Sequence, residues 1–264
     1  MSYSDPVGIF DSGIGGLSIL EKIHDLLPNE NLIYLADSAN APYGPKGEAF
    51  ILERSREIMA FFLEQQVKAV VVACNTATAA AAGKLREEYD IPIIGMEPAI
   101  KPAAEKSQSG VIGVLATEGT LGSDKFVDLK SRFDGKVEII TQPCPGLVEE
   151  IEKAELDTHA IRTLLALFIK PLIAKGADTL VLGCTHYSFI AAQIAEAAVT
   201  AVNIIDTDDA VARRLKNVLE DHSLRSEAGG NVSYFVNGDT AKQAKLFHRC
   251  LGRAVNLEKF QLKT

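Results

Sequence analysis

The sequence predicts an α/β protein with two pseudo-symmetric domains, each built on a parallel β-sheet. Three observations support this prediction. Short apolar, β-branched runs alternate with longer amphipathic stretches along all 264 residues, which is typical of βαβ units. Two of these runs end in a cysteine, at Cys74 and Cys184, and are followed by helical sequence. The order of motifs in the first half also recurs in the second half.

The strands are expected at the short runs because parallel strands, buried on both faces, are continuously apolar. In chain order they are Val7–Asp11, Leu32–Ala36, Ala69–Ala73, Pro92–Gly95, Val111–Leu115, Val137–Thr141, Thr179–Gly183, Asn203–Asp206 and Val232–Val236. Gly229-Gly230 precedes the last of these, which we expect to be hairpin-like.

The helices are expected in the amphipathic stretches between the strands. They are 15–27, 46–66, 76–89, 97–107, 121–133, 158–174, 187–199, 208–221 and 239–252. Pro45 marks the start of the second helix, because proline is well tolerated at the beginning of a helix.

A weak internal repeat relates the two halves. Val7–Gly13 resembles Ile112–Glu118, and Pro42-Tyr43-Gly44 falls where Cys144-Pro145-Gly146 falls. The cysteine strands then match, and each is followed at a similar distance by another apolar run. The repeat predicts a first domain of residues 1–97 plus 208–264 and a second of 98–207, with the active site in the cleft between them.

Cys74 and Cys184 are the most informative residues of this pattern. A lone buried cysteine is most often a small hydrophobe. Here each thiol ends a strand, opens a helix and is followed by hydroxyl or amide side chains, so we expect the helix N-terminus to lower its pKa. Cys144 and Cys250 lack this setting and are interpreted as structural.

The turn Phe10–Leu17 is rich in glycine and joins a strand to a helix. Its spacing is not that of a dinucleotide fingerprint, so either a tight turn or an anion held by backbone N–H groups explains it. Asp11 could bind an ammonium group or tune a neighbouring thiol. Tyr43 and Gly44 could offer backbone donors to a carboxylate, or Tyr43 could simply cap the core. His186 lies two residues after Cys184, so a Cys/His nucleophile pair is conceivable.

Composition excludes several function classes. The net charge of −8 argues against binding to nucleic acid or an anionic membrane, and an anionic substrate must be held by local donors. No apolar run is long enough to span a bilayer, and the N-terminus does not resemble a secretory signal. The sequence holds no dinucleotide fingerprint, P-loop or metal cluster, so no cofactor or metal is expected. Four cysteines without a CxxC pattern indicate free thiols in the cytoplasm.

Two like thiols facing one another suit the inversion of a carbon centre. A racemase removes a proton from one face of a carbon and returns one to the other, which needs two similar acid/base groups. Two alternatives stay open. In a non-catalytic amino-acid-binding module both thiols would be core residues, and in a cysteine-nucleophile hydrolase only one would react.

The motifs also resemble a known family. Gly8–Leu17, Pro42-Tyr43-Gly44, Ala73–Thr78 and Gly183–Tyr187 are similar to the glutamate racemases of the aspartate/glutamate racemase superfamily. The resemblance implies cofactor-independent interconversion of L-glutamate and D-glutamate, supplying D-glutamate for peptidoglycan and hence for cell wall and cell shape. Related aspartate racemases share the two-cysteine plan, so aspartate or a related amino acid is the alternative substrate. The family commonly forms homodimers.

The resemblance also implies roles for individual residues. Cys74 and Cys184 would be the two catalytic bases, assisted by Asp11, Glu152 and His186. The substrate-binding residues would be Asp11, Ser12, Tyr43, Gly44, Asn75, Thr76, Thr117, Thr185 and His186.

Overall fold

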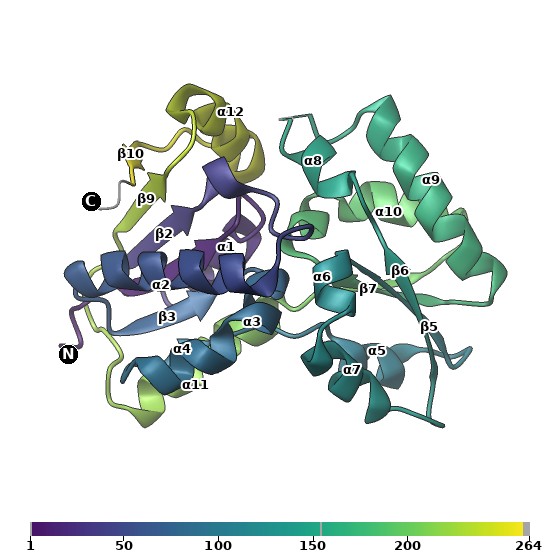
Figure 1. Cartoon of the computed structure of the whole chain (residues 1–264), viewed down its shortest axis with the longest axis horizontal. Helices are drawn as coiled ribbons and strands as arrows, with labels where there is room; N and C mark the ends of the chain where they lie inside the picture. Colours follow the sequence, from purple (N-terminus) through teal and green to yellow (C-terminus); the bar gives the residue numbers. More distant parts are fainter. Residues whose placement is uncertain (1, 154, 261–264) are drawn as a thin grey trace.

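The protein contains two separate parallel β-sheets with their helices packed around them (Figure 1). The structure is a computed structural model and describes residues 2–153 and 155–260. The two-sheet α/β architecture confirms the predicted fold class. Among the helices of the described residues, none is both long enough and apolar enough to cross a membrane.

The first sheet has six strands in the order β10-β9-β2-β1-β3-β4, all paired in parallel. Their bounds are β1 Val7–Asp11, β2 Leu32–Ala36, β3 Ala69–Val72, β4 Ile93–Ile94, β9 Val232–Val236 and β10 Leu257–Lys259. The expectation of a hairpin-like β9 is wrong, because β9 runs parallel to β2. Strand β10 was not expected, since it is a three-residue edge strand with two charged, exposed side chains.

The second sheet has four strands in the order β6-β5-β7-β8, again all parallel. Their bounds are β5 Val111–Ala116, β6 Glu138–Pro143, β7 Thr179–Gly183 and β8 Asn203–Ile205. The neighbour order is that of β2-β1-β3-β4, so β1 corresponds to β5 and β3 to β7. The internal repeat in the sequence is therefore a repeat of topology.

Most long helices form close to the expected positions. They are α1 Leu17–Leu26, α2 Glu48–Glu64, α5 Ile100–Lys106, α9 His159–Ala174, α11 Asp208–Asp221 and α12 Thr240–Leu251. Two expected helices are divided, into α3 Asn75–Ala80 and α4 Ala82–Glu88, and into η2 Thr185–Ile190 and α10 Ala191–Ala198. The expected helix 121–133 forms as the single helix α7 Asp124–Ser131, which begins three residues later because the Ser123 hydroxyl accepts from Phe126 N and caps it. Three short elements were not in the expected set, η1 Ser38–Asn40, α6 Glu118–Leu121 and α8 Leu147–Ile151.

Apolar side chains alternate along each strand and fill a core on both faces of each sheet. Ile9 of β1 joins one core and Phe10 the other. The largest core also contains Leu182 of β7, so it continues from one sheet to the other. We propose the domain boundaries predicted above, 1–97 plus 208–264 and 98–207, on the basis of the two sheets; residues 1, 154 and 261–264 lie outside the described range.

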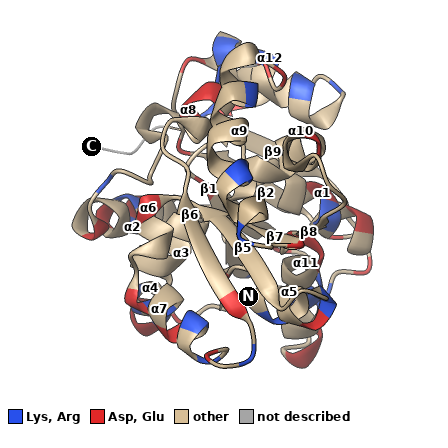
Figure 2. Ribbon diagram, turned by 90° about the vertical axis from the view of Figure 1, so that its right-hand side faces the viewer, with Lys and Arg blue, Asp and Glu red and all other residues tan. Residues whose placement is uncertain are grey.

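Charged side chains are spread over the helices and loops. In Figure 2 the acidic and basic positions are interspersed on the face shown, and most of the strand length is uncharged. This distribution fits the parallel strands, which are covered by helices on both faces.

Candidate active site

Residues that follow three different strands meet between the two sheets. Asp11 ends β1, Cys74 lies two residues beyond β3, and Cys184 directly follows β7. The Thr185 hydroxyl donates to Asp11 Oδ2 over 3.3 Å, which joins the first sheet to the second. The carboxyl ends of parallel strands are where open α/β folds place their ligands. The predicted cleft is therefore the point where the site residues gather.

The glycine-rich turn binds two negatively charged groups, and both are side-chain carboxylates of the protein itself. Gly16 N donates to Asp11 Oδ2 over 2.8 Å, and Ile14 N donates to Glu152 Oε1 over 3.0 Å. Backbone N–H groups at the start of a helix bind negative charge well. The turn thus fixes one carboxylate from each half of the chain.

Close packing explains the glycines of this turn. A Cβ at Gly13 would lie 1.9 Å from Glu152 Oε1, and one at Gly15 would lie 2.3 Å from Thr185 Oγ1. Neither glycine has a positive φ. These positions are glycine because side chains from the second half of the chain occupy the space of a Cβ.

Cys74 is buried, with 6% of its surface exposed. Its thiol lies 3.9 Å from Ser12 Oγ and accepts from Ala77 N, in the first turn of α3, over 3.4 Å. Burial raises the pKa of Cys74, and the charge of Asp11 raises it further, which outweighs the helix N-terminus. The expected lowering of this pKa is therefore wrong for the site without substrate. The charge of Cys184 also raises the pKa of Cys74, so the two thiols interact electrostatically.

Cys184 is accompanied by a buried histidine and a buried carboxylate. Cys184 Sγ lies 3.9 Å from His186 Nδ1, and His186 Nε2 lies 2.8 Å from Glu152 Oε1. Burial opposes a charge on His186, but contacts with Cys184 and Glu152 outweigh it and raise the pKa of His186. Burial likewise opposes the Glu152 charge, but His186 and Ile14 N–H lower the pKa of this carboxyl. The raised pKa favours the protonated form of His186, and this ring lies beside the Cys184 thiol.

Several polar groups at the site have no partner among the described residues. Both side-chain atoms of Asn75, at the start of α3, are buried and make no hydrogen bond, and the same is true of Asp11 Oδ1. Buried polar atoms are rarely left unpaired, because the desolvation cost is about 1–3 kcal/mol each. These atoms provide one donor and two acceptors for a polar ligand.

Hydroxyl groups connect the two halves beside Cys74. Thr76 Oγ1 lies 3.0 Å from Thr117 Oγ1 and 3.4 Å from Thr120 Oγ1. Thr76 belongs to α3, whereas Thr117 caps α6 in the second half. The sequence analysis predicted Thr76 and Thr117 as site residues, whereas Thr120 is identified only by these contacts.

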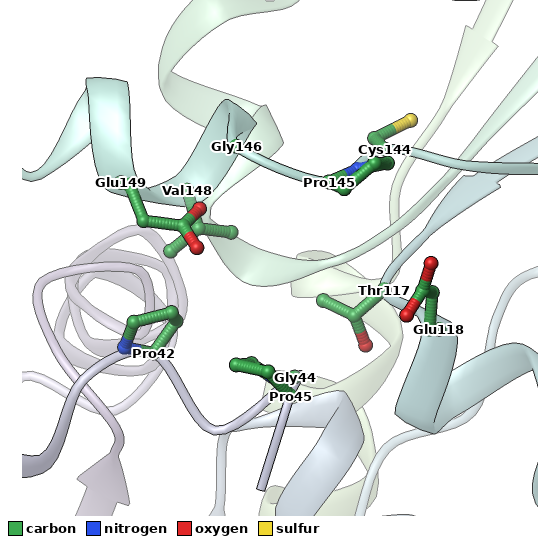
Figure 3. Close-up of a pocket in the computed structure, with 10 residues that line it drawn as sticks. All are labelled: Pro42, Gly44, Pro45, Thr117, Glu118, Cys144, Pro145, Gly146, Val148 and Glu149. Carbon is green, nitrogen blue, oxygen red and sulfur yellow. The ribbon is translucent and has the colours of Figure 1, made fainter.

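Two turns that correspond in the internal repeat face each other across a cavity of about 60 Å³. Figure 3 shows Pro42, Gly44 and Pro45 on one side of it and Cys144-Pro145-Gly146 on the other. Among the described residues, the amide N–H groups of Tyr43 and Gly44 donate to no protein group. The Tyr43 hydroxyl instead donates to Asp37 Oδ2 over 2.5 Å, so its ring is a buried support for the turn.

Cys144 lies nearer to the chemistry than its interpretation as structural implied. It lines the cavity, and its pKa is raised to about 12, first by burial and also by the charge of Cys184. The equivalence of Cys144-Pro145-Gly146 with Pro42-Tyr43-Gly44 was the signal in the sequence that could have placed it here. Cys250 lies on α12 and does not line this cavity. All four cysteines are free thiols.

Comparisons with known proteins agree with this geometry. A profile of the Asp/Glu/Hydantoin racemase family matches residues 8–215. The chain belongs to this family. It is 49% identical over 256 residues to the glutamate racemase of Stutzerimonas stutzeri (strain A1501), with 97% of each chain covered. It is 52% identical over 233 residues to that of Pseudomonas entomophila (strain L48), with 88% of each chain covered.

Solved structures of racemases share the whole fold. Glutamate racemase RacE1 of Bacillus anthracis superposes with a TM-score of 0.88 at 30% identity, covering 98% of both chains. The Escherichia coli glutamate racemase, solved with L-glutamate and the activator UDP-MurNAc-ala, gives 0.87 at 32% identity, covering 98% of this chain and 99% of that one. An aspartate racemase of Picrophilus torridus, at 18% identity and a TM-score of 0.54, shares the fold alone. The resemblance seen in the sequence is confirmed, and the chain is an isomerase of the racemase type.

Proposed function

We propose that this racemase interconverts L-glutamate and D-glutamate by a two-base mechanism with Cys74 and Cys184 and without a cofactor. The observation that carries the proposal is the equivalent placement of the two thiols. Each follows the strand third in order along the matching part of its sheet, β3 or β7, and the contact of Thr185 with Asp11 brings the carboxyl ends of the two sheets together. Enantiomers are mirror images, so two like bases on opposite faces of Cα serve both directions equally.

The reaction balances with one proton removed and one returned. The thiolate on one face takes the Cα proton, and the electron pair of the broken C–H bond delocalises into the α-carboxylate. The thiol on the other face then gives its proton to Cα, which leaves the two cysteines with exchanged protonation states. His186, whose Nδ1 lies 3.9 Å from Cys184 Sγ, is the polar partner of this thiol as its proton leaves and returns.

The substrate itself helps to activate Cys74. We infer that the α-ammonium group lies beside Asp11, whose Oδ1 has no partner in the described protein. A positive charge there neutralises Asp11, which is a main cause of the raised pKa of Cys74 after burial. Substrate binding therefore lowers the pKa of Cys74.

Local hydrogen-bond donors bind the two carboxylates of glutamate, in spite of the protein's net charge of −8. We assign the α-carboxylate to Asn75, Thr76 and Thr185, since the Asn75 amide is buried and unpaired. We assign the distal carboxylate to Ser12 and to the free N–H groups of Tyr43 and Gly44. Thr117 forms the wall opposite Gly44, because a Cβ at Gly44 would lie 3.1 Å from Thr117 Cβ.

The proposal is tested by running each enantiomer in D₂O under initial-rate conditions. Because the accepting and donating thiols differ, the product carries solvent deuterium at Cα while recovered substrate keeps its hydrogen. Cys74→Ser and Cys184→Ser are each expected to lose more than 99% of racemisation, and Cys250→Ser serves as the matched cysteine control. Normal racemisation by either active-site variant refutes the two-thiol mechanism. Binding of glutamate without exchange by the wild type supports a binding module instead.

We further propose that the D-glutamate formed supplies peptidoglycan synthesis in the cytoplasm. Free thiols fit a reducing compartment. Depletion of the protein from its host is expected to cause loss of cell shape and lysis that external D-glutamate relieves. Growth and normal cell shape during depletion, without added D-glutamate, refute this role. That the protein forms a homodimer stays a prediction, and analytical ultracentrifugation tests it by measuring the molecular mass in solution.

A further inference from the structure

Asp37 is a buried carboxylate that the proposed chemistry does not use. It directly follows β2, is completely buried, and its N–H donates to the Asp11 carbonyl over 3.0 Å. Its two oxygens accept five hydrogen bonds from four side chains, which are Asn40, Tyr43, Arg54 and Asn237. A buried charge that is fully paired holds its neighbours in one arrangement.

The donors to Asp37 come from three separate segments. Tyr43 lies in the turn that lines the cavity, and Arg54 on α2 makes a two-pronged contact of 3.1 Å and 2.7 Å. Asn237 lies in the segment between β9 and α12, 200 residues from Asp37 in the chain. Residues 8–215 match the family profile, so Asn237 comes from the part of the chain beyond it.

Asn237 contacts the 37–45 loop at two points. Its side-chain Nδ2 donates to Asp37 Oδ1, and its side-chain Oδ1 accepts from Ala39 N over 2.9 Å. The neighbouring Gly238 packs closely on the loop, because a Cβ there would lie 3.2 Å from Ser38 Cβ. One side chain thus satisfies both the buried carboxylate and the Ala39 amide of η1.

We propose that Asn237 is a positioning residue for the substrate-binding turn Tyr43-Gly44 and acts through Asp37. Tyr43 reaches Asp37 through its hydroxyl, and its own N–H and that of Gly44 are left free at the cavity. Asn237 adds the donor from the C-terminal segment to this network, so that segment orients the donors for the distal carboxylate. This inference rests on the proposed function, which assigns that carboxylate to the turn.

Two variants and one control test the inference in the full-length enzyme. Asn237→Ala removes both contacts. Asn237→Asp keeps the shape and the acceptor for Ala39 N but places a like charge against Asp37. Asn231→Ala is the matched control, because Asn231 lies at the other end of β9, is exposed, and its side chain makes no hydrogen bond among the described residues.

We expect Asn237→Ala to raise KM for both glutamate enantiomers about tenfold, which corresponds to about 1.4 kcal/mol, with less than a threefold change in kcat, because it removes a hydrogen bond to a buried carboxylate. Asn237→Asp should raise KM further, whereas Asn231→Ala keeps the wild-type KM. If Asn237 mattered only for its shape, the order would be reversed, and Asn237→Asp would raise KM less than Asn237→Ala.

Amide hydrogen exchange of residues 38–46 gives a readout that does not need turnover. It is expected to be about tenfold faster in both Asn237 variants than in the wild type and the control. Wild-type exchange or wild-type KM in both Asn237 variants overturns the inference. If the wild-type protein does not racemise glutamate, the proposed function fails, and exchange alone decides whether Asn237 orders the turn.

Discussion

Replacing Gly13 by alanine tests whether the space at the glycine-rich turn serves the chemistry. The new Cβ would lie 1.9 Å from Glu152 Oε1 and 3.1 Å from His186 Nε2. Neither neighbour is the free end of a surface side chain, because Glu152 is held by Ile14 N and His186. The carboxylate must therefore leave, and its hydrogen bonds to the ring and to the turn are lost.

The magnitude follows from those losses. Overpacking a tight site costs about 1–3 kcal/mol, and losing a bond between charged groups about 1.5–3 kcal/mol, so we expect Gly13→Ala to lower the unfolding free energy by about 3 kcal/mol. For a chain of this length that corresponds to a fall in melting temperature of about 6–12 °C. Loss of a positioned acid/base partner lowers kcat by about 100-fold.

The assay combines calorimetry with the initial rate of racemisation in both directions. Gly83→Ala is the control, since its Cβ would make only an ordinary contact of 3.5 Å with Lys125 Nζ. Alanine inside helix α4 should increase stability by about 0.5–1 kcal/mol and leave kcat unchanged. A Gly13→Ala enzyme with wild-type kcat refutes the expectation that Glu152 assists the catalytic bases. Unchanged stability refutes the steric argument itself.

Three further predictions concern titratable groups. His186→Asn should lower kcat/KM about 100-fold, and by the same factor in both directions because the equilibrium constant between enantiomers is fixed; an unchanged kcat/KM in initial-rate assays would contradict this. The pKa of Glu152 is lowered in the folded state, so its stabilisation is present above the unfolded value of about 4.3 and is lost as pH falls. Wild type and Glu152→Gln should thus differ in urea unfolding at pH 7 and converge in acid, and a constant difference argues against the charge. Burial, and then Asp206, raise the pKa of Asp208 to about 6, so its charged form costs stability above about pH 4. Asp208→Asn should be more stable by roughly 3 kcal/mol at pH 7 and equal to wild type near pH 3, and a loss of stability at pH 7 would count against this.

Strand prediction succeeded where a single local signal decides the structure. The apolar runs of β1 and β7 begin and end at the expected residues, because a strand buried on both faces is apolar along most of its length. Strand β10 carries no such signal, since its side chains are partly or largely exposed and its pairing with β9 depends on the sheet already being formed. The start of α7 was misplaced for a related reason, because a capping serine such as Ser123 also occurs inside helices.

The expectation for Cys74 shows the same limit for electrostatics. The sequence contains the helix start that favours a thiolate, and the structure retains this contact with Ala77 N. Burial and the nearby Asp11 carboxylate act in the opposite direction and prevail. Burial and the Asp11 charge both depend on distant parts of the chain coming together, so their effect on the pKa of Cys74 could not be predicted from composition and spacing.

The sequence by itself determined the two-sheet fold class, the duplication and the pair of cysteines, because each of these is visible in patterns of adjacent residues. Only the tertiary structure showed why Gly13 is a glycine, that the turn's anions are Asp11 and Glu152, and that Asn237 reaches Asp37. These facts concern atoms brought together from residues five to 200 positions apart. A local pattern reports backbone preference and burial, whereas the space left for a Cβ and the partner of a buried charge are set by the packing of the whole chain.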